Sequence, residues 1–189
     1  KYLGSNYRFS TEFYTDGILE NETLKGNLYI KGSGDPKLVT EQLWLIVNEL
    51  RNLPIKKIKG NIIADDSFFD KQKRIKTWIK NPGAQAYEAP LGALSFNFNT
   101  VKVYVSPGGK VGDRPGIVIE PENEYIKLEN NAQTLRPGKL RRLIVNRVDK
   151  EDHDLITVSG GINIGQPRAH YFLNITNPTQ YALSVFKSY

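Results

Sequence analysis

The chain has 189 residues, of which 39% are hydrophobic and 11% aromatic, as in a folded protein of one or two small domains. It contains no cysteine, which excludes disulfides, thiolate metal sites and a cysteine nucleophile. The formal charge of +6 and the pI of about 9.4 permit binding to nucleic acid, to an anionic membrane or to an acidic polymer, and select none of them.

No apolar run is long enough to span a bilayer, and the first residues lack the apolar core of a signal peptide. We therefore expect no transmembrane segment in this chain and any export signal to lie outside it.

The first seventy residues or so combine strand and helix patterns. Aromatic side chains recur at strand spacing in residues 7–14, and Asp16 with Gly17 predicts a turn after them. A second strand is expected at residues 28–30. It must end in the turn at residues 32–36, where two glycines and a proline leave no room for further pairing.

The clearest helix is predicted from Thr40, which we expect to be its N-cap, and it must end before Pro54. Its apolar positions recur at helical spacing: Leu43, Ile46, Val47 and Leu50. Residues 60–65 then predict a buried strand that ends on acidic residues, so this part of the chain has α/β character.

From residue 100 onward the pattern changes to short β-rich runs separated by glycine, proline and asparagine. These runs are 101–105, 117–119, 125–128, 143–148 and 155–158. Such spacing indicates a small sandwich or barrel without a helix of its own. One more strand is expected at residues 171–173. A final helix follows, with Asn177 as its cap and Pro178 as its first residue.

Enzymes that acylate a serine through three short motifs need Ser-x-x-Lys, then Ser-x-Asn, then Lys-Thr-Gly. Residues 184–187 match the first motif and residues 95–97 match the second. They stand in reversed order, and Lys-Thr-Gly is absent. We therefore expect no catalytic residue in this chain.

Metal and cofactor motifs are equally weak. Only His153 and His170 are present, which argues against a histidine-based metal site. The acidic residues of 149–154 favour a solvated hairpin loop over a calcium site, because glycine and glutamate are missing where a calcium loop needs them. Asp65 and Asp66 are candidates for an acid–base pair, but carboxylates at a strand end usually cap a turn or face water. We expect neither metal nor cofactor.

Five segments carry a resemblance to a known family. In order they are LGSNYRFST (3–11), LKGNL (24–28), GSGDP (32–36), GNIIADDSFF (60–69) and YEAPLGAL (87–94). Taken together they resemble the class C low-molecular-mass penicillin-binding proteins. These are serine D-Ala-D-Ala carboxypeptidases and endopeptidases that act on peptidoglycan. The resemblance covers most of residues 3–99 and is loose beyond residue 100.

The resemblance implies that the chain is the long insertion between the first and second active-site motifs of such an enzyme. It implies an α+β fold, with an α/β accessory domain of residues 3–93 and 168–189. A β-rich domain, a small sandwich or barrel, would be inserted at residues 94–167. The parent enzyme would be exported to the periplasm or cell envelope. Its partners would be peptidoglycan stem peptides and the catalytic transpeptidase-like domain of the same protein, with no nucleic acid.

In that family the segment corresponding to residues 78–87 approaches the active-site cleft. The resemblance therefore makes Trp78 and Tyr87 the candidate substrate-binding residues. Family members often place an aspartate there to pair with a charged stem-peptide side chain. This chain offers Asn81, Pro82 and Gln85 instead, which argues against such recognition. The structural alternative is that Tyr87 is buried against the helix of residues 43–50.

Two other classes of function remain open. The high pI and the aromatic residues interleaved with lysines also suit a basic, nucleic-acid-binding β domain. A purely structural module fixed to the peptidoglycan layer is the second alternative.

Overall fold

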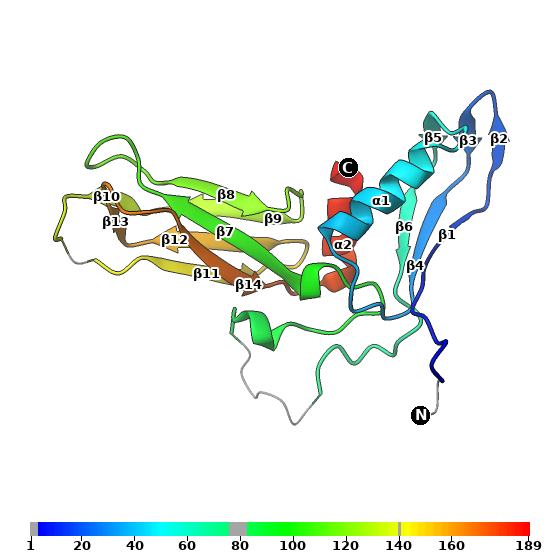
Figure 1. The fold of residues 1–189 in the computed structure, drawn as a ribbon, viewed down its shortest axis with the longest axis horizontal. Coiled ribbons are helices and arrows are strands. Elements are labelled where there is room, and N and C mark those ends of the chain that lie inside the picture. The colour runs from blue at the N-terminus through cyan, green and yellow to red at the C-terminus, as the bar shows by residue number, and fades with distance from the viewer. Residues whose placement is uncertain (1–3, 76–82, 140) are drawn as a thin grey trace.

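The computed structural model of the chain describes residues 4–75, 83–139 and 141–189. These residues form two α-helices and five small sheets, so the predicted mixed α+β character is confirmed. Figure 1 shows an N-terminal part that carries α1, a β-rich part, and helix α2 between them. Neither of the two described helices is long and apolar enough to cross a membrane.

The N-terminal part has one helix among six short strands. They are β1 Thr11–Thr15, β2 Ile18–Glu20, β3 Thr23–Lys25, β4 Leu28–Gly32, α1 Thr40–Arg51, β5 Lys57–Lys59 and β6 Ile62–Asp65. In the larger sheet β4 pairs antiparallel with β1 and parallel with β6. Parallel neighbours need a crossover connection, and α1 supplies it between β4 and β6. The apolar side chains of Leu28 and Ile30 alternate into the core, which explains why this segment is a strand.

Two local predictions for this part need correction. The first strand begins at Thr11, whereas Tyr7 and Phe9 precede it and pack edge to face, with ring centroids 5.2 Å apart. The expected capping by Thr40 is also wrong, because Val39 is the N-cap and makes no side-chain cap bond. The Thr40 amide instead donates to Asn97 Oδ1 at 3.1 Å, a partner far along the chain.

The remaining elements form the β-rich part and the last helix. They are the 3-10 helices η1 Ala86–Glu88 and η2 Asn97–Asn99, strands β7 Thr100–Ser106, β8 Gly116–Glu120, β9 Ile126–Asn130, β10 Gln133–Leu135, β11 Ile144–Asp149, β12 Asp154–Ser159, β13 Gly161–Asn163 and β14 Ala169–Asn174, and α2 Pro178–Ser188. All six strands predicted beyond residue 100 are present, with small shifts at their ends. Strands β10 and β13, of three residues each, were not predicted.

Three sheets make up the β-rich part, in the orders β14-β7-β8, β11-β12-β9 and β10-β13. The inward residues of two central strands are fully buried, Val103 and Val105 on β7 and Ile156 and Val158 on β12. All four belong to one hydrophobic core cluster that also contains residues of α1 and α2. Alternation of period two therefore explains both the strands and their shared core.

Helix α2 contacts both parts. Its predicted cap is confirmed, because the Asn177 side chain accepts a hydrogen bond from the Gln180 amide and Pro178 is the first helical residue. Toward the N-terminal part, the rings of Phe186 and Phe13 lie 5.6 Å apart. Toward the β-rich part, Tyr181 packs near Tyr125, with centroids 6.4 Å apart.

The chain enters and leaves the β-rich part at neighbouring points. Strand β14 pairs with β7 along its whole length, so the strand expected at residues 171–173 lies in a β-rich sheet. Just beyond it, the Ile175 amide donates to the Asn99 carbonyl at 3.0 Å, immediately before β7 begins. The predicted domain limits at residues 94 and 167 stay a prediction.

Candidate functional site

Residues 83–88, which we call the Tyr87 segment, lie against the end of strand β14. Tyr87 is the middle residue of η1, and its side chain is 80% exposed. Gln85 forms an isolated antiparallel bridge with Leu173 of β14. The alternative of a tyrosine buried against the helix of residues 43–50 is therefore wrong. Trp78, the other candidate, lies outside the described residues.

Asn174 fixes this segment to the strand. Its side chain is fully buried, and its Nδ2 donates to the carbonyls of Gly83 at 3.0 Å and Gln85 at 2.9 Å. The Asn174 backbone amide donates to the Ala84 carbonyl at 3.0 Å. Asn174 thus satisfies three successive backbone carbonyls that would otherwise need a neighbouring strand. These bonds hold in place the backbone that leads to Tyr87.

Glu88 closes the segment from its other end. The Glu88 side chain is buried, and its Oε2 accepts a hydrogen bond from the Gly83 amide at 2.6 Å. The Arg74 guanidinium donates to the Glu88 carbonyl. Burial lowers the pKa of Arg74 from its usual range, with the positive charge of Arg147 as a secondary cause. Tyr87 therefore projects from a loop that is bonded on both sides.

A buried ion pair, Arg147 with Asp154, holds the Asn174 side chain in place. Arg147 Nε donates to Asn174 Oδ1 at 3.0 Å, while its Nη1 lies 3.6 Å from Asp154 Oδ1. The side chains of Arg147 and Asp154 are 8% and 0% exposed. Asp154 also accepts from the amide and the hydroxyl of Thr176. Burial raises the pKa of Asp154, although these donors oppose the shift.

The same network reaches the start of α2. The Tyr125 hydroxyl lies 2.9 Å from Thr176 Oγ1 and accepts from the Asn177 amide at 3.1 Å. Burial raises the pKa of Tyr125 to about 12, so its hydroxyl stays protonated near neutral pH. The β-rich part, the Tyr87 segment and α2 thus share one continuous set of polar contacts.

The two partial serine motifs are engaged in structural contacts. Ser184 Oγ accepts from the amides of Glu124 at 2.8 Å and Tyr125 at 3.0 Å, which tie α2 to the chain before β9. Ser95 Oγ donates to the Gly92 carbonyl at 2.7 Å. Asn97 is the residue that binds Thr40 at the start of α1. The Ser184 hydroxyl thus joins a loop to α2 and the Ser95 hydroxyl closes a turn, and in the described residues neither is hydrogen-bonded to a side chain that could act as its base.

The acidic residues singled out in the sequence are likewise engaged in local or structural contacts. Asp65 Oδ1 accepts from the Ser67 amide at 2.8 Å, and hydrogen bonds from Ser67 lower the pKa of Asp65, which opposes a role as general acid. Asp66 Oδ1 accepts from the Leu94 amide at 2.8 Å. Asp152 pairs with His153 in the exposed hairpin loop between β11 and β12. Within the described residues no group of three or more histidines, aspartates or glutamates could hold a metal ion.

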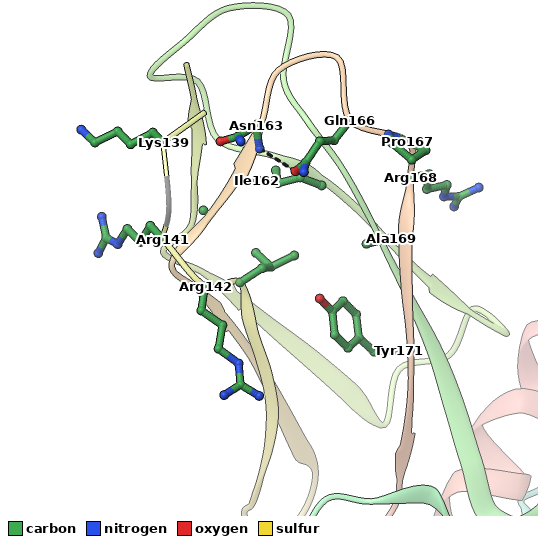
Figure 2. Close-up of a pocket in the computed structure, with 12 residues that line it drawn as sticks. Lys139, Arg141, Arg142, Ile162, Asn163, Gln166, Pro167, Arg168, Ala169 and Tyr171 are labelled. Carbon is green, nitrogen blue, oxygen red and sulfur yellow. Dashed lines mark hydrogen bonds between the residues drawn. The ribbon is translucent and has the colours of Figure 1, made fainter. Parts of the chain in front are cut away.

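A hollow of about 580 Å³ lies at the far end of the β-rich part (Figure 2). Its interior is lined by Tyr171 and Ile162, whereas the side chains of Lys139 and Arg141 point away from it. The Gln166 side chain is used locally, accepting from the Asn163 amide at 3.0 Å. Since its polar groups do not converge, this hollow is a weaker candidate than the Tyr87 segment.

The sequence did not identify the residues that hold the candidate site. Asn174 and Arg147 stand in ordinary strand patterns, and no spacing relates either one to residues 83–85. Asn174, Arg147 and residues 83–85 come together in the folded chain alone, where Gln85 bridges to β14 and Arg147 of β11 binds Asn174.

Known proteins resemble this chain. Residues 1–189 match the D-Ala-D-Ala carboxypeptidase 3 (S13) family. A D-alanyl-D-alanine carboxypeptidase of Actinomadura sp. (strain R39) is 26% identical over 151 residues, which are 77% of this chain and 28% of that protein. The D-alanyl-D-alanine carboxypeptidase DacB of Haemophilus influenzae is 33% identical over 97 residues, 51% of this chain and 20% of that protein.

The fold has a counterpart among solved structures. The crystal structure of penicillin binding protein 4 (dacB) from Haemophilus influenzae aligns with a TM-score of 0.76 at 21% identity, over 96% of this chain and 40% of that one. The chain thus spans less than half the length of these relatives. The resemblance seen in the five sequence segments is confirmed, and the chain belongs to the D-Ala-D-Ala carboxypeptidase 3 (S13) family.

Proposed function

We propose that this chain forms the non-catalytic accessory domains of a penicillin-binding D-alanyl-D-alanine carboxypeptidase or endopeptidase that acts on peptidoglycan. The observation that carries the proposal is the family match of all 189 residues in a chain that spans 28% of one relative and 40% of a solved one. The parent enzyme would act in the periplasm or cell envelope. Its transpeptidase-like domain would supply the nucleophilic serine and the hydrolysis of the acyl-enzyme.

The Tyr87 segment is the part of this chain that we propose as a wall of the parent's substrate cleft, together with Trp78. The exposed Tyr87 ring on a doubly bonded loop supports this role. An amphipathic ring can pack on a peptide stem while its hydroxyl bonds water or backbone. A loop held by Asn174 and Glu88 would bring that ring to the substrate with little loss of conformational entropy.

The proposal includes a division into two domains. An α/β domain would contain α1 and α2, and a β-rich sandwich or barrel would be inserted into it. The pairing of β14 with β7 favours ending the insertion after Asn174 rather than at residue 167.

The first test is chemical. The 189-residue chain should neither hydrolyse D-Ala-D-Ala peptides nor form a covalent adduct with labelled penicillin, because both reactions need a nucleophile within reach of its base. The parent enzyme labelled in parallel is the positive control. A stoichiometric adduct on this chain that disappears in Ser184→Ala would overturn the proposal.

The second test concerns Tyr87 in the parent enzyme. Tyr87→Ala should lower kcat/KM for a stem peptide by about 1–2 kcal/mol of transition-state binding, with the melting temperature nearly unchanged. Phe68→Ala is the matched control, since this aromatic side chain is also exposed, at 54%, and lies outside the segment. Equal kcat/KM in wild type and Tyr87→Ala would remove Tyr87 from the cleft.

A further inference from the structure

The outer face of the β14-β7-β8 sheet carries an exposed cluster of aromatic side chains. Because Val101, Val103 and Val105 of β7 point into the core, Lys102 and Tyr104, which alternate with them, point outward. The strand register adds neighbours from both sides. It sets His170 and Val118 beside Tyr104, and Phe172 and Glu120 beside Lys102. We call Tyr104, His170, Phe172 and Val118 the aromatic face.

The members of the aromatic face form a continuous surface. Ring centroids lie 6.5 Å apart for Tyr104 and His170, and 5.9 Å apart for His170 and Phe172. Phe172 is 50% exposed and Val118 is 53% exposed. Single exposed apolar residues are ordinary, but a contiguous set on one sheet face marks a binding surface. Alternation along two paired strands produces this set.

Two cations lie on these rings. The Arg168 guanidinium carbon is 3.6 Å from the centroid of Tyr104. Lys102 Nζ lies 4.5 Å from the same ring and 5.5 Å from that of Phe172. Among the residues that the structure describes, neither cation forms an ion pair with a carboxylate. The cation–π contacts therefore orient both charges while leaving them available to an anionic group.

A groove of about 620 Å³ adjoins the aromatic face along β8. Its lining includes Tyr104, Val118 and Arg168 together with two exposed carboxylates, Glu120 and Glu122. Carboxylates accept hydrogen bonds from hydroxyl groups, which suits a sugar. The same carboxylates repel a chain of phosphates, whose binding requires an excess of basic side chains. The balance of charge thus favours a polyhydroxylated polymer with occasional carboxylates over a nucleic acid.

The aromatic face also adjoins the Tyr87 segment. Phe172 directly precedes Leu173, the residue that forms the bridge with Gln85. A polymer held across β14 would therefore lie next to the proposed wall of the cleft, with its side branches close to Tyr87.

From these contacts we propose that the aromatic face binds the glycan strand of peptidoglycan. Sugar rings pack on Phe172 and His170, and the carboxylates of the groove accept from sugar hydroxyls. Lys102 and Arg168 pair with carboxylates of the attached stems. The inference rests on the proposed function, which identifies peptidoglycan as the polymer. It adds a second binding surface that is separate from the cleft.

The experiment uses the 189-residue chain and soluble glycan strands released from sacculi by an amidase that removes the stem peptides. Binding is measured by isothermal titration, with affinity for strands that keep their stems measured in parallel. The double variant Phe172→Ala/His170→Ala should bind glycan about tenfold more weakly, the loss expected for removing two stacked aromatic side chains. Trp44→Ala, which removes a 54% exposed aromatic side chain from α1, is the matched control and should bind as wild type does.

A second variant guards against loss of folding. Val118→Lys changes an exposed residue on the opposite side of Tyr104 and should also weaken glycan binding, and urea midpoints equal to wild type show that both variants fold. Wild-type affinity in both folded variants, or no binding of glycan strands to wild type, overturns the proposal. Tighter binding of single-stranded DNA than of glycan at equal salt overturns it too. The proposed function fails separately, by a penicillin adduct on this chain.

Discussion

At the scale of single residues, the Asn174 side chain joins the Tyr87 segment to β11 through Arg147. Asn174 ends β14 with a buried amide whose donors reach two carbonyls of the Tyr87 segment and whose acceptor meets Arg147. Buried polar groups of this kind contribute little net stability while satisfied, but cost much when one partner is removed. The network therefore specifies the position of the segment more than it stabilises the fold.

Asn174→Ala should lower the free energy of unfolding by about 1–3 kcal/mol, because the carbonyls of two residues and the Arg147 guanidinium each lose one of their hydrogen-bond partners. Urea denaturation followed by circular dichroism measures the change. Asn131→Ala, at an exposed asparagine whose side-chain amide donates to the exposed Glu129, should change the value by less than about 0.5 kcal/mol. Equal losses in the two variants would show that the buried network adds nothing.

The carboxylate of Asp16 makes the stability of the chain depend on pH in a direction that can be predicted. It accepts from the amide and side chain of Asn27 and from the Tyr29 hydroxyl, and these bonds, the Asn27 amide foremost, lower the pKa of Asp16 below its ordinary 3.8. As pH falls, the unfolded chain takes up the proton first, so this contribution to stability is present above the ordinary value and lost below it.

Asp16→Asn should therefore be less stable than wild type at pH 7, and the difference in urea midpoint should shrink as pH falls through about 4 toward 3. Asp70→Asn is the control, since among the described residues Asp70 accepts from the Gln72 amide alone. A difference that grows on acidification would contradict the assigned direction.

At the scale of elements, the sequence predicted strands well wherever apolar residues alternate over five or more positions. β7 is the clearest example, since three valines alternate with polar or amphipathic residues. β10 and β13 are too short to show a period, and they pair with each other across residues distant in sequence. The N-cap of α1 was wrongly predicted for a similar reason, because the Thr40 amide binds Asn97, a residue distant in sequence, and the N-cap is Val39.

Gly160, between β12 and β13, lies where the backbone comes very close to Arg142 and Leu143. It has φ +86, and a Cβ there would lie 1.9 Å from the Arg142 carbonyl. Gly165 has a similar φ of +81 but nothing within 4 Å. Gly165→Ala should cost about 1 kcal/mol for the left-handed backbone alone, and Gly160→Ala at least about 2 kcal/mol. Thermal unfolding of the two variants compares them directly, and equal melting temperatures would exclude the close approach.

At the scale of the whole molecule, α2 is the element on which both parts depend. Tyr181 is fully buried, and its hydroxyl donates to the Thr100 carbonyl at 3.0 Å at the start of β7. The sequence predicted this helix and its cap. It could not predict that one face would meet Phe13 and another Tyr125, because each contact joins segments more than fifty residues apart.

Tyr181→Ala should destabilise the chain by about 3–5 kcal/mol, the range for truncating a large buried aromatic side chain. Tyr181→Phe removes only the hydroxyl bond and should cost about 1 kcal/mol. Leu45→Ala, at a 55% exposed position on α1, controls for a change outside the core. Urea midpoints rank the three, and a tolerated Tyr181→Ala would show that the two parts do not need α2 to pack.

The candidate sites were predictable to different degrees. The exposure of Tyr87 agrees with a residue that meets a ligand, but its position came from the family resemblance rather than from periodicity. The aromatic face has a visible signal in hindsight, because Lys102 with Tyr104 and His170 with Phe172 each stand two residues apart. What the sequence lacks is the register that sets these two pairs side by side.

The hydrogen bond between the Ile175 amide and the Asn99 carbonyl holds together the two ends of the segment between them, which is about 75 residues long. Because the two ends of this excursion, the segment between Asn99 and Ile175, lie side by side, it forms a closed loop. The entropic cost of closing such a loop grows only slowly with its length. Such a unit can be acquired, replaced or transplanted in one genetic event while the helices and sheet around it keep their pairing. Relatives in which this excursion differs in size could therefore keep the same scaffold and differ only in what the added sheets recognise.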